Sequence, residues 1–186
     1  MTLREQIDWI LLQHGEQMYG NNIYAYHLNA VHKVLEKVWE EVVVPKNSNY
    51  NLFHKLSLAC LGHDLIEDTN NSYNDVKKVL GEEVADIIYD VTNELGKNRK
   101  ERAFKTYQKT MKNPEAILVK ICDRIANTEF SKETGSRMFK KYQEEYPDFR
   151  LTLHDFGRIS EDETVNTITD KLWDELDRLS EFKNEV

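Results

Sequence analysis

One stretch of the sequence places a histidine and three acidic residues directly after an apolar run. In "LSLACLGHDLIEDT", His63 and Asp64 end the run, and Glu67 and Asp68 follow one turn later. On a continuous helix these carboxylates would crowd together in the last turn, where the helix dipole also disfavours anions. A bound divalent cation would offset both effects and the cost of burial. The alternative, a solvated acidic helix end, predicts polar residues before the acids, so the apolar run favours a metal site.

A fourth carboxylate stands in an equally apolar setting. Asp123 lies in "AILVKICDRIAN", whose apolar residues indicate a largely buried helix. A buried aspartate beside Arg124 is equally well explained by a structural ion pair, so both interpretations stay open for Asp123 taken alone. Asn127 lies one helical turn further, on the same face.

A histidine from an earlier segment completes the set of metal-ligand residue types. His27 precedes Val31 and Leu35 at helical spacing. A lone histidine on such a face is more often structural, but here it accompanies the pair His63–Asp64 and the buried Asp123. Two imidazoles and two carboxylates suit a first-row divalent ion such as manganese, iron or zinc. Water on such an ion becomes a nucleophile near neutral pH.

Helical periodicity dominates the segments that must position these residues. The expected helices begin at Leu3, Tyr24, Leu52, Val76, Glu82, Asn98, Pro114, Gly135 and Thr164. We expect the third helix to carry the acidic stretch, the fifth to run to Gly96, and the eighth to end before Pro147. A polar turn follows the first helix, and Pro45 breaks the chain after the second. No segment reads as a convincing strand, which predicts an all-α fold.

Composition and charge limit the classes of function. The chain has 186 residues, the length of one ordinary domain, and a formal charge of −8. An acidic chain argues against a nucleic-acid partner held by a basic surface. No stretch is long and apolar enough for a membrane span, and the charged N-terminus does not resemble a signal peptide. Cys60 and Cys122 lie in apolar helical runs, as buried reduced thiols do. We therefore expect a cytoplasmic protein.

Four ordered blocks of the sequence resemble the HD-domain metal-dependent phosphohydrolases, and among them the hydrolase domain of RelA/SpoT-type alarmone enzymes and their small free-standing relatives. These are Tyr24 to His27 with Val31; Gly62 to Thr69; Leu80 and Gly81 with Val84, Ile88 and Thr92; and Val119 and Lys120 with Asp123, Arg124 and Asn127. The resemblance implies one HD-domain helical bundle over residues 1–186, with a motif-bearing core at about 5–145 and a helical extension at 146–186.

The resemblance also implies a role for each motif residue. One divalent ion, manganese in the alarmone hydrolases, would be held by His27, His63, Asp64 and Asp123. Glu67 and Asp68 would orient the attacking water and handle protons, and Asn127 would help to hold the substrate. In this chain iron or zinc could take the place of manganese.

This chain departs from the family pattern where the base is read. Family members carry a basic pair shortly after an H-x-x-Q motif in the first helix, but here His14 to Gln17 is followed by Met18, Tyr19 and Gly20. Leu28 replaces the proline that follows the first histidine. We expect Tyr19 to stack on the base instead, and therefore a weaker preference for guanine, because an aromatic ring stacks on any base.

Two basic segments flank the Asp123 helix and are candidates for phosphate binding. They are "GKNRKERAFKTYQK" and "SKETGSRMFKKYQ". Solvated helix faces explain any one of these cations equally well. Our candidate substrate contacts in them are Arg99, Lys140, Lys141 and Tyr142.

The sequence thus predicts a nucleotide phosphohydrolase, most consistent with a 3′-pyrophosphohydrolase of (p)ppGpp. A deoxynucleotide triphosphohydrolase, a 5′-nucleotidase and a catalytically silent nucleotide-binding regulator remain alternatives. The chain leaves no room for a synthetase domain, so we expect hydrolase activity alone. The oligomeric state stays open, a homo-oligomer included.

Overall fold

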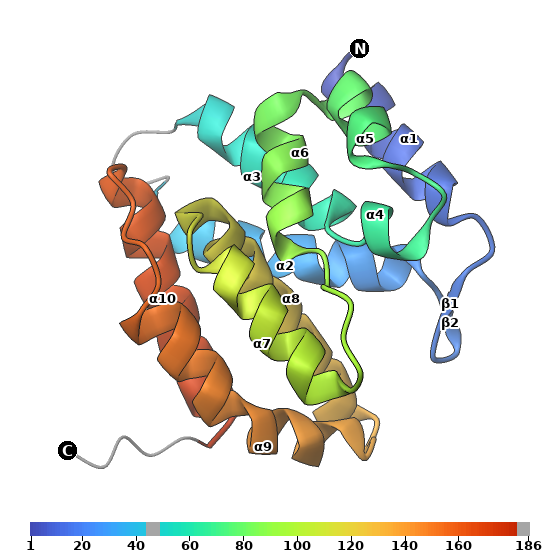
Figure 1. The fold of residues 1–186 in the computed structure, drawn as a ribbon. Coiled ribbons are helices and arrows are strands. Elements are labelled where there is room, and N and C mark those ends of the chain that lie inside the picture. The colour runs from blue at the N-terminus through green and yellow to red at the C-terminus, as the bar shows by residue number, and fades with distance from the viewer. Residues whose placement is uncertain (44–48, 182–186) are drawn as a thin grey trace.

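The computed structural model describes residues 1–43 and 49–181, and its fold is all-α, as predicted (Figure 1). Its helices are α1 (Leu3–His14), α2 (Ala25–Val42), α3 (Tyr50–Gly62), α4 (Leu65–Asp68), α5 (Tyr73–Leu80), α6 (Glu82–Val91), α7 (Arg99–Thr110), α8 (Pro114–Glu133), α9 (Met138–Arg150) and α10 (Glu163–Leu179), with a π-helical segment, η1 (Leu151–Asp155), after α9. The break expected at Pro45 lies outside the described residues.

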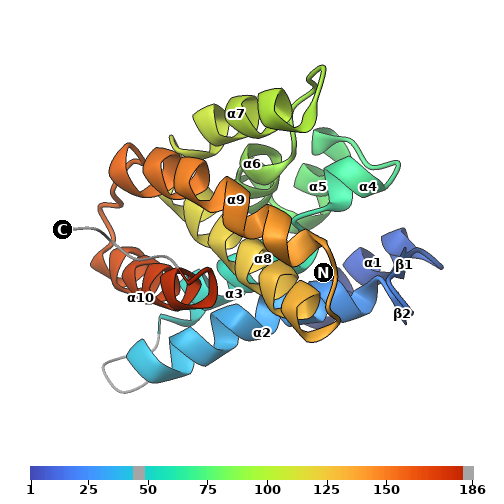
Figure 2. The same ribbon diagram turned by 90° about the horizontal axis from the view of Figure 1, so that it is seen from below.

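Helix α8 is the centre of the bundle. It packs against α2, α3, α6, α7, α9 and α10, and Figures 1 and 2 show these helices around it. Asn113 caps its N-terminus by accepting hydrogen bonds from the first backbone amides, and Pro114 occupies the first turn, where no amide partner is lost. Leu118, Val119 and Ile121 have no exposed surface. Because α8 is enclosed on several sides, a charged side chain on it needs a partner.

The apolar helix before the acidic stretch ends earlier than predicted. Helix α3 stops at Gly62, and the short α4 begins at Leu65. Asp64 lies between them with φ −100° and ψ 3°, outside the helical region. Close packing accompanies the break, since a Cβ on Gly62 would come within 2.9 Å of Ile88. The acids beyond Leu65 therefore lie in a separate helical turn, and the predicted cost of placing them at a helix C-terminus does not apply.

Two predicted helix ends were also wrong. Helix α6 ends at Val91 rather than near Gly96, because its buried stripe ends there and Leu95 is 88% exposed. Helix α9 continues through Pro147, which removes only one amide donor. The fully buried Tyr146 and Phe149 on either side of this proline anchor the helix to the core.

A small hairpin replaces the polar turn expected after α1. Strand β1 (Met18–Tyr19) pairs antiparallel with β2 (Asn22–Ile23). Gly20 in the turn has a φ of 60°, which favours glycine, and an added Cβ would lie 3.0 Å from Phe130. The hairpin can therefore lie against α8, and it places Tyr19 beside the start of α2. Within the described residues, no helix combines the length and apolar character needed to cross a membrane.

Candidate metal-dependent active site

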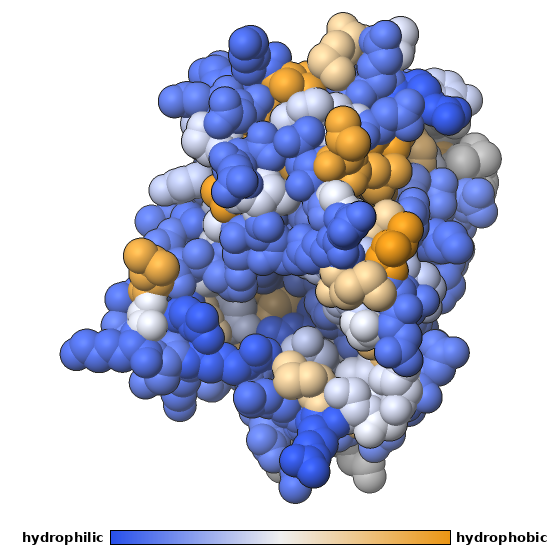
Figure 3. Space-filling view, turned by 90° about the vertical axis from the view of Figure 1, so that its right-hand side faces the viewer, coloured by the Kyte–Doolittle hydropathy of each residue, from blue (hydrophilic) through white to orange (hydrophobic). Residues whose placement is uncertain are grey.

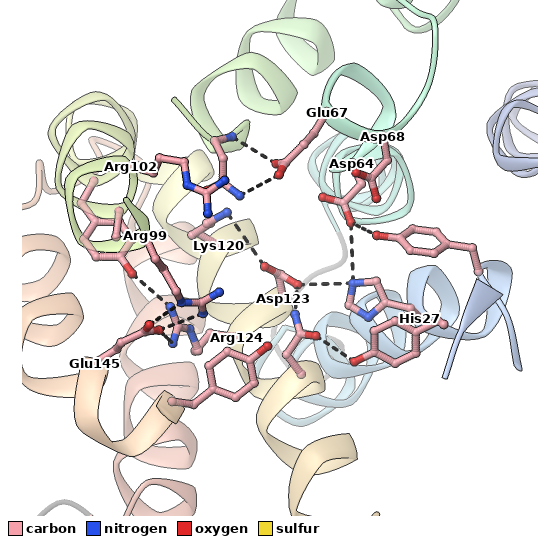
Figure 4. Close-up of a pocket in the computed structure, with 17 residues that line it drawn as sticks. His27, Asp64, Glu67, Asp68, Arg99, Arg102, Lys120, Asp123, Arg124 and Glu145 are labelled. Atoms are coloured by element: carbon pink, nitrogen blue, oxygen red, sulfur yellow. Dashed lines mark hydrogen bonds and ion pairs between the residues drawn. The ribbon is translucent and has the colours of Figure 1, made fainter. Parts of the chain in front are cut away.

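The four predicted metal ligands come together from separate elements. His27 comes from the first turn of α2, His63 from the end of α3, Asp64 from the α3–α4 junction and Asp123 from α8. The Nε2 atoms of His27 and His63 are 3.3 Å apart, and one oxygen of Asp64 lies 2.9 Å from Nε2 of His63. One oxygen of Asp123 lies 3.4 Å from the first imidazole and 3.6 Å from the second. Figure 4 shows His27, Asp64 and Asp123 converging on the cavity.

The donor atoms fit a divalent cation. Donor atoms of His27, His63 and Asp64 lie within 4.8 Å of one another. Nδ1–H of His63 donates to the carbonyl oxygen of Cys60 at 2.8 Å, so Nε2 is the nitrogen that would coordinate a metal ion after losing its proton. Two imidazole nitrogens and carboxylate oxygens form the mixed set that manganese, iron and zinc accept.

The charges of the cluster compensate one another. Burial lowers the pKa of His63, but Asp64 and Asp123 outweigh that effect and hold it well above 6.5. Burial raises the pKa of Asp64, whereas the neighbouring His63 more than reverses this and sets it to about 2. Burial likewise acts to raise the pKa of Asp123, yet hydrogen bonds from His27 and His63 bring it well below 3.8. Both carboxylates are therefore ionised at neutral pH, as metal ligands must be.

Hydrogen bonds from outside the cluster orient both carboxylates. The Tyr24 hydroxyl donates to Asp64. The Tyr19 hydroxyl donates to the Asn127 side-chain oxygen at 2.8 Å, and the Asn127 amide nitrogen donates to Asp123. Partners of this kind fix the orientation of metal ligands. Asn127, expected to hold substrate, thus contacts a predicted ligand directly.

The ring of Tyr19 is engaged by neighbouring aromatic side chains. It stacks on His27 with centroids 4.6 Å apart, and it contacts Phe130 at the same centroid distance. A base that stacks on Tyr19, as the sequence suggested, would have to compete with these side chains.

The two predicted catalytic carboxylates are each held by one amide side chain. Asn93 donates to both oxygens of Glu67, through its backbone amide at 3.2 Å and its side chain at 2.9 Å. Gln17 donates to Asp68 at 2.9 Å, and Nδ1–H of His14 donates to the side-chain oxygen of Gln17 at 2.9 Å. The loop after α6 and the end of α1 therefore set the direction of these acids.

A cavity of about 300 Å³ joins the cluster to a group of cations. His27 and Asp64 lie on one side of it, and Arg99, Arg102 and Glu145 lie on the other (Figure 4). Lys120 and Asp123 lie between them, 3.9 Å apart. Figure 3 shows a hollow between two lobes in the lower half of a mostly hydrophilic face. The arrangement could bind a phosphorylated ligand between a metal ion and a cationic wall.

Glu145 binds two of the three arginines that line the cavity, Arg99 and Arg124. It accepts hydrogen bonds from Arg99 and, at 3.3 Å, from Arg124. The Arg124 guanidinium also donates to the Tyr107 hydroxyl at 3.0 Å and lies 4.9 Å from the Tyr142 ring centroid. The structural ion pair between Asp123 and Arg124, which the sequence left open, does not form. Arg124 pairs with Glu145 instead, and Asp123 faces the histidines.

Two of the predicted substrate contacts lie away from the cavity. Tyr142 and Arg99 line it, but Lys140 and Lys141 do not. Both lysines are exposed, and Lys140 faces Glu144 on its own helix at 4.0 Å. The separation follows from helix geometry, since residues one and two positions apart point in different directions.

Comparisons with known proteins agree with the resemblance seen in the motifs, although no family model matches the chain. The guanosine-3′,5′-bis(diphosphate) 3′-pyrophosphohydrolase of Aquifex aeolicus is 32% identical over 164 residues, which cover 78% of this chain and 23% of that protein. The Drosophila melanogaster enzyme of the same name, MESH1, is 32% identical over 71 residues, which cover 38% of this chain and 40% of that protein. The matched region thus spans less than half of either relative.

A solved structure has the same fold. It belongs to a metazoan ortholog of SpoT that hydrolyses ppGpp, and it matches with a TM-score of 0.64 at 20% identity over 94% of both chains. The resemblance to the RelA/SpoT-type hydrolase domain is confirmed. The structural match covers 94% of this chain and supports the fold, and the Aquifex aeolicus relative adds 32% identity over 164 residues.

Several residues of this hydrolase-like site carried little signal in the sequence. Tyr24 and Lys120 are positions of the motif blocks, but the sequence pattern indicated no role for either residue. Asn93 and Glu145 belong to no motif considered, and only the folded structure places them beside Glu67 and Arg99. Side-chain partners that are far apart in sequence are not visible in local spacing.

We predict that the Tyr24 hydroxyl contributes to metal binding through its hydrogen bond to Asp64. Tyr24→Phe removes the hydrogen bond to Asp64 and keeps the ring that stacks on His14. We expect manganese affinity, measured by calorimetric titration, to fall about 10- to 100-fold, the usual effect of losing such a partner. Tyr26→Phe, two residues further along the chain and 44% exposed, is the matched control and should bind normally. Equal affinity in the two variants would remove Tyr24 from the site.

Proposed function

We propose that this protein is a metal-dependent phosphohydrolase that removes the 3′-pyrophosphate from a (p)ppGpp-type alarmone. The observation that carries the proposal is the cluster of His27, His63, Asp64 and Asp123 at a cavity that the Glu67–Asp68 pair also lines. Two relatives are guanosine-3′,5′-bis(diphosphate) 3′-pyrophosphohydrolases and one structural neighbour hydrolyses ppGpp, which supports the choice of substrate.

In this proposal one divalent ion is held by the histidines and by Asp64 and Asp123. When bound, such an ion lowers the pKa of water and neutralises charge on phosphate oxygens. Manganese is our choice, because the resemblance implies it and the mixed donor set accepts it. Glu67 and Asp68 hold and move the protons of the attacking water and of the leaving oxygen. Asn93 and Gln17 keep these two acids pointed toward the cavity.

The cationic side of the cavity binds the remaining phosphates. Arg99 and Arg124 are bound to Glu145, whereas the guanidinium of Arg102 has no hydrogen-bond or ion-pair partner among the described residues. An unpaired guanidinium at the wall of a cavity is ready to bind a phosphate in bidentate fashion. We assign Arg102 and Lys120 to the phosphate that stays on the nucleotide.

A second candidate, hydrolysis of other nucleotides, is favoured by one observation. The basic pair that reads guanine in the resembling family is missing after Gln17, and Tyr19 is engaged by His27 and Phe130. A site without a guanine reader would accept adenine analogues as well. We also propose a cytoplasmic location, since Cys60 and Cys122 are buried free thiols of the kind kept in reducing compartments.

A nucleotide panel tests the proposed function. Guanosine and adenosine 3′,5′-bis(diphosphates), deoxynucleoside triphosphates and 5′-monophosphates are incubated with protein plus manganese or plus chelator, and released phosphate is measured with and without added pyrophosphatase. We expect signal from the bis(diphosphates) only, dependent on manganese and on pyrophosphatase. Release of orthophosphate from monophosphates, or of triphosphate from deoxynucleotides, would assign the site to one of the alternatives.

A further inference from the structure

A second and larger cavity lies between α7 and α9. Its volume is about 580 Å³, compared with about 300 Å³ for the cavity at the metal cluster. Phe104 forms part of one wall and is 62% exposed, and Leu151 on the other side is 49% exposed. Such exposure of large apolar side chains inside a concave surface indicates a binding site rather than ordinary surface.

The two cavities share one wall. Arg99, Ala103, Tyr107 and Glu145 line both of them. The ion pair of Arg99 with Glu145 therefore stands at the junction, with the metal cluster on one side and Phe104 on the other. Phe104 lies five residues beyond Arg99 on α7, about 7 Å along the helix axis. A single elongated ligand can touch both cavities across this junction.

The size of the metal-proximal cavity calls for such an extension. Pockets for small molecules measure roughly 300–1,000 Å³, so a cavity of about 300 Å³ is at the lower limit. A nucleoside that carries two diphosphates is a large ligand. Four tyrosines also line this cavity, but their rings are engaged by other side chains: Tyr19 by His27, Tyr24 by His14, Tyr107 by Phe149 and Tyr142 by Arg124.

The lining of the second cavity carries both signs of charge. Its cations are Arg99, Lys100 and Lys141, and its acids are Glu144, Glu145 and Asp148. Lys141 lines it and has no hydrogen-bond or ion-pair partner among the described residues. Lys100, also in the lining, has only a distant contact of 3.9 Å to Asp148, with both side chains largely exposed, and an exposed pair of this kind is weak. Two cations are therefore available to phosphates near an aromatic ring that can stack on a base.

We infer that the groove between α7 and α9 holds the nucleoside end of a nucleotide whose phosphate end lies in the metal-proximal cavity, with Phe104 stacked on the base and Lys141 near the distal phosphate. The inference rests on the proposed function for its reaction, but the binding it describes can be measured without turnover. It assigns a place for the base in a chain that lacks the basic pair after Gln17 and whose Tyr19 ring is engaged elsewhere.

Steady-state kinetics of Phe104→Ala test the groove. With guanosine 3′,5′-bis(diphosphate) as substrate, we expect KM to rise about tenfold with kcat unchanged, since base stacking stabilises ground state and transition state alike. With methyl diphosphate, which has no base, the variant should match the wild type. Phe156→Ala is the matched control, because Phe156 is 65% exposed and lies in neither cavity lining.

Equilibrium binding separates this inference from the proposed reaction. Calorimetric titration with the same nucleotide in the presence of chelator prevents turnover, and Phe104→Ala and Lys141→Gln should each weaken binding several-fold. If the wild type hydrolyses nothing and both variants still bind the nucleotide more weakly, the proposed hydrolase function is wrong and the inferred binding groove is supported. Unchanged KM and unchanged affinity in both variants would overturn the groove. A nucleotide that alters methyl diphosphate hydrolysis without competing with it would also overturn it, since the groove would then be an effector site.

Discussion

Asp123→Ala is expected to remove the bound metal and to abolish hydrolysis. One oxygen of Asp123 lies within 3.6 Å of both imidazole nitrogens of the cluster. Loss of this carboxylate removes a negative ligand and leaves His63 beside a single carboxylate, Asp64. Because removing any essential part of such a unit costs most of the rate, we expect activity at the background of the assay.

Elemental analysis and thermal unfolding measure this effect together. Wild-type protein should contain about one divalent ion per chain, as one donor set can hold, and Asp123→Ala should contain none. A ligand at 100 times its Kd stabilises the folded state by about 2.7 kcal/mol, so chelator should lower the Tm of the wild type and leave the variant unchanged. Asp123→Asn keeps the side-chain shape and serves if the alanine variant does not fold. Asp90→Ala, which removes a half-buried aspartate bonded to Asn113, is the matched control; full metal occupancy in Asp123→Asn would contradict the site.

Glu67→Gln is expected to retain the metal and to lose turnover. The substitution preserves the size of the side chain and one acceptor for Asn93, but it removes the carboxylate that accepts a proton. Turnover should fall about 10²- to 10⁴-fold, the range found for a lost general acid or base. Glu82→Gln, in the first turn of α6 and paired with Lys77, is a control that should behave like the wild type.

Metal content distinguishes the two roles open to Glu67. If Glu67→Gln loses its metal together with its activity, Glu67 is a ligand and the assignment is wrong. Wild-type turnover in Glu67→Gln would instead assign proton transfer to Asp68. The variant to measure would then be Asp68→Asn.

The four candidate ligands could be selected from the sequence because their segments carry local signals. His27, His63 and Asp123 each stand in or at the end of a segment whose apolar residues mark a buried helix. The cost of burying a charged or imidazole side chain in such a segment must be offset by a partner. The ordered motif blocks indicated that this partner is a divalent metal ion. The helices themselves could be predicted from periodicity and from residues that favour helix ends, such as Ser72, whose side chain accepts a hydrogen bond from the Asp75 amide at the start of α5.

Other parts of the site depend on contacts that local patterns do not contain. The break between α3 and α4 follows from the packing of Gly62 against Ile88, and it gives Glu67 a direction that a continuous helix would not. Asn93 reaches Glu67 across 26 positions, and Arg99 reaches Glu145 across 46. Lys140 and Lys141 were chosen by charge and position in the chain, and only the packing of α9 shows which side chains of that segment face the cavity.

Mass spectrometry of the products from guanosine 3′,5′-bis(diphosphate) tests the central claim most directly. Water added across the bond between the 3′ oxygen and its phosphorus gives pyrophosphate and guanosine 5′-diphosphate. We predict these two products in equal amounts with manganese-loaded protein, and neither with Asp123→Asn or with chelator. Orthophosphate as the first product, or intact substrate after prolonged incubation with metal-loaded protein, would contradict the proposal that this site is a 3′-pyrophosphohydrolase.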